Sequence, residues 1–100
     1  MNKVPVQITW LGPAEGGRPA PPPGPTYSTV AKFEAWADRW PREAWSIVAE
    51  WDVQPGAGLV TRARMRLLAA DGPQDLLDAG SAFELYEGRR LVARGVVLAT

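Results

Sequence analysis

Residues 45–53 read Trp-Ser-Ile-Val-Ala-Glu-Trp-Asp-Val and form the most regular stretch of the chain. Every odd-numbered position in it is apolar, whereas Ser46, Glu50 and Asp52 occupy even-numbered positions. This alternation is typical of a β-strand that turns one face to a core and the other to solvent. Residues 54–58, Gln-Pro-Gly-Ala-Gly, follow directly and predict a turn at the end of the strand.

The same alternation recurs on both sides of this stretch. It predicts strands over residues 3–11, 27–34, 59–68, 82–87 and 91–98. Six short strands separated by turn residues, with almost no helix, favour an antiparallel all-β barrel or sandwich. We expect a closed barrel, because closure removes the exposed strand edges that invite aggregation.

The apolar positions of these strands define the expected interior. It should hold Val6, Ile8, Phe33, Ile47, Trp51, Leu59, Ala63, Met65, Phe83, Leu85 and Val97. Two segments lie outside the alternation. Residues 12–25 contain six prolines and four glycines and predict a long loop. Residues 34–44, with Trp36 and Trp40 four positions apart, predict either one helical turn or an irregular crossover.

Length and composition exclude several classes of protein. One hundred residues allow one domain, over residues 1–100, and a 46% hydrophobic content allows it to bury a core. Eleven basic and eleven acidic residues balance, which removes the long-range field of a general nucleic-acid binder. Without histidine or cysteine the chain has no imidazole or thiolate metal site, and no cofactor is expected. It has no signal peptide or membrane-spanning run, so we expect a cytoplasmic protein.

Four short motifs follow one another in a recognisable order. They are Glu15-Gly16-Gly17-Arg18, Gln54-Pro55-Gly56, Gly80-Ser81-Ala82-Phe83 and the final run from Glu87-Gly88-Arg89-Arg90 to Val97. Together they resemble the C-terminal β-barrel, the third domain, of elongation factor Tu, from about Val4 to the end of the chain. The resemblance implies a closed six-stranded Greek-key barrel and a role related to translation.

In that family the GTPase is a separate domain, and this chain has no Gly-x-x-x-x-Gly-Lys-Ser/Thr loop. The family barrel contacts the T-stem of aminoacyl-tRNA and the partner GTPase domain. Arg18, Glu87 and Gly88 match positions that resemble tRNA-contacting ones, and Arg89 and Arg90 share their hairpin. This resemblance implies an RNA- or tRNA-binding surface as one alternative.

Other residues of the chain argue against RNA binding. Where the family has Tyr-Arg-Pro-Gln, residues 26–29 are Thr-Tyr-Ser-Thr, and the loop after Leu68 carries Asp71, Asp75 and Asp78. An acidic loop near a phosphate path would repel the ligand. A protein partner is therefore the favoured interpretation, and the oligomeric state stays open.

The basic residues have two interpretations. Arg62, Arg64 and Arg66, joined by Arg89, Arg90 and Arg94, could form a patch for phosphate or an acidic partner. The favoured alternative is a solvated strand face paired with Glu84, Glu50 or Asp52. Arg18 beside Glu15 could bind an anion, but a contact that pins its loop to the barrel is favoured.

The crossover is the expected partner surface. Trp36 and Trp40 could anchor a protein partner within a rim that includes Arg39 and Arg42, or they could plug the barrel end. For catalysis, no spacing singles out a pair among Glu15, Glu50, Asp52, Asp75, Asp78 and Glu87. The sequence therefore predicts a non-enzymatic interaction module.

Overall fold

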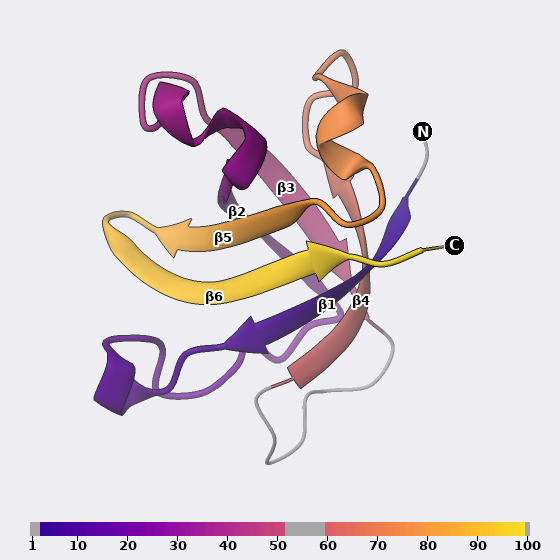
Figure 1. Ribbon diagram of the computed structural model, residues 1–100. Coiled ribbons are helices and arrows are strands. Elements are labelled where there is room, and N and C mark those ends of the chain that lie inside the picture. Colours follow the sequence, from indigo (N-terminus) through magenta and orange to yellow (C-terminus); the bar gives the residue numbers. More distant parts are fainter. Residues whose placement is uncertain (1–2, 52–59, 100) are drawn as a thin grey trace.

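The strands close into a β-barrel in which each one pairs with two neighbours (Figure 1). The computed structural model describes residues 3–51 and 60–99. The strands are β1 (Val4–Trp10), β2 (Thr26–Phe33), β3 (Trp45–Glu50), β4 (Val60–Leu67), β5 (Ala82–Glu87) and β6 (Arg90–Val97). The described connections contain the 3-10 helices η1 (Pro13–Glu15), η2 (Glu34–Arg39) and η3 (Gln74–Leu77). The closed six-stranded all-β barrel that the alternation predicts is confirmed.

The order of strands around the barrel is β1-β4-β3-β2-β5-β6, and all neighbours are antiparallel. After the consecutive strands β2, β3 and β4, the chain returns so that β5 lies beside β2, which is a Greek-key arrangement. Because the ring is complete, β1 pairs with both β4 and β6. The strands therefore leave no open edge to which another strand could add.

The core follows the predicted alternation. The expected interior residues are buried wherever the structure describes them, and Leu59 lies outside the described residues. The core also takes in Trp10, whose Nε1 donates a hydrogen bond of 2.9 Å to the buried Oγ1 of Thr61. Rings of Tyr27 and Trp51 meet Trp10 edge-on, at centroid distances of 5.5 and 6.2 Å. These aromatic side chains fill one part of the interior.

The connecting segments lie at different places around the strands. In Figure 1, η2 and η3 lie above the strands, and η1 lies below the β5–β6 hairpin. The crossover at residues 34–44 contains 3-10 turns that are interrupted at Trp36, whose φ of −116° and ψ of 23° are not helical, so it has features of both expected alternatives. The helix η3 buries Leu76 and Leu77 against the core. The expected turn at residues 54–58 lies outside the described residues.

The proline-rich segment packs along the barrel. Trp51 donates its backbone N–H to the carbonyl of Pro25 at 2.9 Å, and Pro22 is buried. Gly24 lies so close to the indole of Trp51 that a Cβ there would collide with the ring. This packing gives the segment a defined course, and that course brings Arg18 to the barrel.

Candidate functional site

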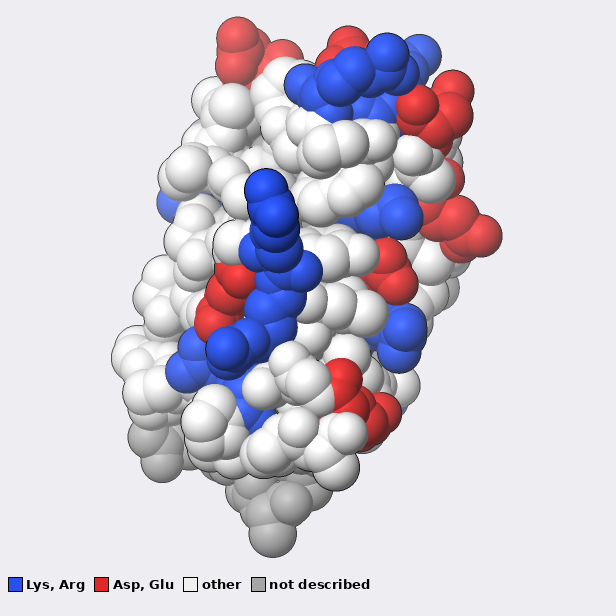
Figure 2. Space-filling view, turned by 90° about the vertical axis from the view of Figure 1, so that its left-hand side faces the viewer, with Lys and Arg blue, Asp and Glu red and all other residues white. Residues whose placement is uncertain are grey.

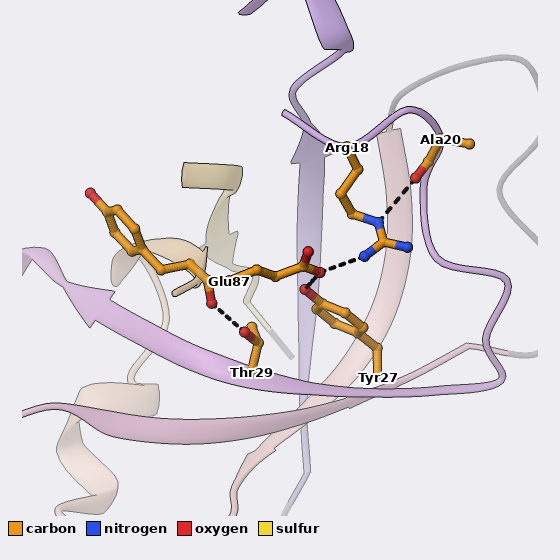
Figure 3. Close-up of polar contacts among 6 residues, drawn as sticks. Arg18, Ala20, Tyr27, Thr29 and Glu87 are labelled. Carbon is orange, nitrogen blue, oxygen red and sulfur yellow. Dashed lines mark hydrogen bonds and ion pairs between the residues drawn. The ribbon is translucent and has the colours of Figure 1, made fainter. Parts of the chain in front are cut away.

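Arg18 and Tyr27 both contact one carboxylate oxygen of Glu87 (Figure 3). The Nη1 of Arg18 and the hydroxyl of Tyr27 each lie 2.5 Å from Oε2 of Glu87. Arg18 also donates from Nε to the carbonyl of Ala20 at 3.1 Å. The cluster joins the proline-rich segment, the first residues of β2 and the last residue of β5. It therefore ties the proline-rich segment and the adjoining start of β2 to the distant end of β5.

The electrostatics of the cluster favour a charged Glu87. Burial alone would raise the pKa of this carboxyl, but hydrogen bonds from Tyr27 and Arg18, with the charges of Arg18 and Arg90, bring it below the ordinary value. For Tyr27, burial first and the hydrogen bond to Glu87 second raise the pKa of the phenol well above its usual value. The phenol thus stays a donor and the carboxylate an acceptor at neutral pH.

The structure brings together only part of the RNA-binding set that the resemblance implies. Arg18 and Glu87 are in contact, and Arg90 is paired with Glu87 across the β5–β6 hairpin. Gly88 and Arg89 are exposed at the tip, where Gly88 has a φ of 64°. A phosphate would have to compete with Glu87 for Arg18. The pinning contact expected for Arg18 is present, and its partner is Glu87.

Glu15, the carboxylate next to Arg18 in the motif, has another contact. Its Oε1 accepts a hydrogen bond of 3.4 Å from the backbone N–H of Gly12. Sequence reasoning missed Tyr27 as a member of the cluster. Its position at the start of a strand and on the inward face of the alternation was the available signal, because an inward tyrosine hydroxyl needs a polar partner.

The two tryptophans of the crossover have different surroundings. Trp36 packs against the core, with its ring 6.4 Å from that of Trp45 at an interplanar angle of 65°. The guanidinium of Arg39 lies over the Trp36 ring, 4.2 Å from its centroid. Trp36 therefore matches the plug interpretation, with its outer side covered by a cation.

Trp40 packs instead on Tyr86 of β5. The ring centroids are 4.9 Å apart at an interplanar angle of 31°, and both side chains are partly buried. Tyr86 donates its hydroxyl to Oε1 of Glu84 at 3.2 Å, which holds the ring in place. Burial first and the charge of Glu84 second raise the pKa of this phenol. We call this pair of rings the Trp40–Tyr86 surface; sequence reasoning did not identify Tyr86 as part of it.

Charged residues flank Trp40 in the crossover and interact among themselves. Arg39 forms an ion pair of 3.6 Å with Glu43, and Arg42 donates to the carbonyl of Asp38 at 3.2 Å. Figure 2 shows both signs of charge gathered at the top of the view, at the height of η2. The crossover thus carries charges of both signs, and their role as a rim stays a prediction.

A cavity of about 360 Å³ lies between η2 and strands β2, β5 and β6. Its lining includes Phe83 and the charged side chains of Lys32, Glu34, Glu84 and Arg94. Glu84 lies 3.9 Å from Lys32 and 3.4 Å from Arg94. Because these charges compensate one another, the cavity has no strong preference for an anion or a cation.

The arginines that could have formed one patch, the less favoured interpretation, divide between two regions. Arg62, Arg64 and Arg66 lie on β4, whereas Arg90 and Arg94 belong to β6, and β1 lies between those strands. Of the expected acidic partners, Glu50 lies opposite Arg64. Glu84 lies on β5 and pairs with Lys32 and Arg94, and Asp52 is outside the described residues.

Within residues 3–51 and 60–99, no three Asp or Glu side chains are grouped so that they could hold a metal ion. In the same residues, no helix is long and apolar enough to span a membrane. No protein-family model matches the chain, and no curated protein matches its sequence.

Proposed function

We propose that this barrel is a non-enzymatic docking module and that a protein partner binds the Trp40–Tyr86 surface. The observation that carries the proposal is the position of Trp40. Both crossover tryptophans are half-buried, but the Trp40 ring packs on the outward Tyr86, whereas Trp36 packs against the core. Partly exposed Trp and Tyr side chains supply much of the energy in protein interfaces, particularly within a polar rim.

The free energies expected for the two kinds of contact indicate that the rings of Trp40 and Tyr86, and not the charged residues, would anchor a partner. Burying a large apolar side chain at an interface contributes about 1.5–3 kcal/mol, whereas an exposed ion pair contributes about 0–1 kcal/mol. Arg39 and Arg42 already interact within the crossover, so they suit a rim that orients the partner. The partner is then expected to present an apolar or aromatic side chain to Trp40.

We also propose that the barrel is related to the third domain of elongation factor Tu. The four motifs and the closed six-stranded barrel both support this relationship. In that family the corresponding barrel contacts another protein domain, which agrees with a docking role. RNA binding through Arg18 and the β5–β6 hairpin is less favoured, because Arg18 is engaged with Glu87.

The test is capture of partners from extracts of the source cell, with and without RNase. The wild-type chain is compared with Trp40→Ala and with Arg89→Ala, which removes an exposed arginine of the hairpin tip. We expect a protein that is retained after RNase, lost with Trp40→Ala and kept with Arg89→Ala. Retention that disappears with RNase, or with Arg89→Ala but not Trp40→Ala, would favour the RNA alternative and contradict docking at the rings.

A further inference from the structure

The outward side chains of β4 form a row with a distinctive order. Thr61, Ala63, Met65 and Leu67 are buried in the barrel, so the residues between them project outward. The outward positions, including Leu68 just after the strand, are Val60, Arg62, Arg64, Arg66 and Leu68. Three arginines are thus bracketed by two aliphatic residues, and we call these five positions the β4 row.

The two ends of the row are exposed apolar side chains. Val60 is 55% and Leu68 54% exposed, and they are the large hydrophobic residues most open to solvent in the part of the chain that the structure describes. Arg62 is also exposed and forms no ion pair or hydrogen bond with a described residue. The row therefore offers both apolar and cationic groups to an incoming molecule.

Among the described residues of the strands beside the row, the register places one carboxylate, Glu50, opposite an arginine. On β1, Thr9, Gln7 and Pro5 lie opposite Val60, Arg62 and Arg64. On β3, Val48 lies opposite Arg66, and Glu50 lies opposite Arg64.

Glu50 is itself held by a cation. Its Oε1 lies 2.5 Å from Nζ of Lys3. The hydrogen bond from Lys3, opposed by slight burial and helped by the charges of Lys3, Arg64 and Arg66, lowers the pKa of Glu50. Lys3 thus offsets Glu50, and the charges of Arg62 and Arg66 are those of the row that can attract an anion.

The backbone of β4 is engaged within the barrel. It pairs with β1 over residues 60–65 and with β3 over residues 64–67, so along these residues a ligand cannot add as another strand. Recognition must use the side chains, which recur along the strand at about 6.6–6.8 Å. One face of an extended polypeptide has the same repeat.

We propose that the β4 row binds an acidic, extended segment of a protein partner, with carboxylates at alternate positions and an apolar residue at each end. Two carboxylates four positions apart on an extended segment can contact Arg62 and Arg66 at the same time. Val60 and Leu68 can then pack against the apolar residues at the two ends of that segment. A nucleic acid fits less well, because single strands are held by aromatic side chains that stack on bases, and the row has none.

This surface is separate from the Trp40–Tyr86 surface. In the ring of six strands, β4 and β5 are three places apart in either direction, so they lie on opposite sides of the barrel. The inference therefore goes beyond the proposed function. Trp40→Ala should leave binding at the β4 row unchanged, so a failure of either proposal is recognised independently of the other.

The test uses a labelled peptide of about nine residues, with glutamates at alternate positions and a leucine at each end. Its affinity for the full chain is measured by fluorescence anisotropy. We expect an isomer of the same composition with adjacent glutamates to bind more weakly, and binding to weaken with added salt.

Two sets of variants locate the site. Arg62→Gln with Arg66→Gln should weaken peptide binding about tenfold, and Leu68→Ser should weaken it severalfold. Arg42→Gln with Arg89→Gln removes the same charge elsewhere and should leave the affinity within about twofold. Melting temperatures of all variants establish that the barrel stays folded.

Three results would overturn the proposal. They are equal losses in the two double-arginine variants, equal binding of the two peptide isomers, and tighter binding of a single-stranded oligouridylate or of anionic phosphatidylserine vesicles than of the peptide. The first two results would indicate non-specific attraction. The third would assign the row to a nucleic acid or a membrane surface.

Discussion

Arg18 and Glu87 are 69 positions apart in the chain, and the Nη1 of one lies 2.5 Å from Oε2 of the other. The pair fastens the proline-rich segment to the end of β5, beside the hydroxyl of Tyr27. The two side chains are 28% and 31% exposed, so water screens their attraction only in part. The contact is therefore a structural tie with a measurable contribution to stability.

Replacing Glu87 with glutamine should destabilise the barrel. The variant loses the charge that Arg18 and Tyr27 share, and we expect the free energy of unfolding to fall by about 1–2 kcal/mol. For a chain of this size that corresponds to a melting temperature lower by roughly 4–15 °C. Glu15→Gln is the matched control, because its carboxylate contacts only a nearby backbone N–H. Equal shifts in the two variants would contradict the tie.

The same carboxylate should make stability depend on pH. Its pKa is lower in the folded than in the unfolded chain, so the unfolded chain binds more protons as the pH falls below about 4.3. The contribution of Glu87 is complete above that pH and is lost as the pH falls through the lowered folded value. Urea unfolding at a series of pH values should therefore show a shallower acid dependence for Glu87→Gln than for wild type. Parallel curves would refute the assignment.

The buried hydrogen bond between Trp10 and Thr61 should be sensitive to loss of its acceptor. Thr61→Val keeps the shape of the side chain but leaves the indole N–H of Trp10 unpaired, which costs about 1–3 kcal/mol. Thr9→Val, on the exposed side of β1, makes the same chemical change without that loss. Chemical denaturation of both variants measures the difference, and a stable Thr61→Val protein would show that the bond contributes little.

Gly24 should resist substitution more strongly than Gly88. Both have a positive φ, 71° and 64°, so alanine pays a similar backbone cost of about 1–2 kcal/mol at each. At Gly24 the added methyl group also meets the indole of Trp51, whereas at Gly88 it meets nothing within 4 Å. We expect a further loss of about 1–3 kcal/mol for Gly24→Ala, measured by thermal unfolding. Equal losses would mean that Trp51 can move aside.

The two crossover tryptophans should differ in their effect on stability. Trp36→Ala removes a side chain that packs against the core and should cost roughly 2–4 kcal/mol. Trp40→Ala removes the ring contact with Tyr86, worth about 0.5–1.5 kcal/mol. Calorimetry of the two variants tests this, and an equal loss for Trp40 would contradict its assignment to a surface.

Much of the barrel could be predicted because alternation is a local property. Whether Ile47 or Met65 points inward depends on the period of its own strand, and that period is written in a few neighbouring residues. The crossover was harder to predict, because Trp36 and Trp40 are the same residue type in one segment that lies outside the strand alternation. They differ only in what lies against them, the core for one and Tyr86 for the other.

The sequence by itself determined which segments are strands, which face of each strand turns inward, and that no site of the chain is built on imidazole or thiolate chemistry. Only the tertiary structure decided that β5 lies beside β2 and that Arg18 meets Glu87 and not Glu15. It also separated the arginines of β4 from those of β6. The physical reason is range: strand pairing and ion pairs join residues far apart in the chain, and local patterns carry no record of which distant segment becomes the neighbour.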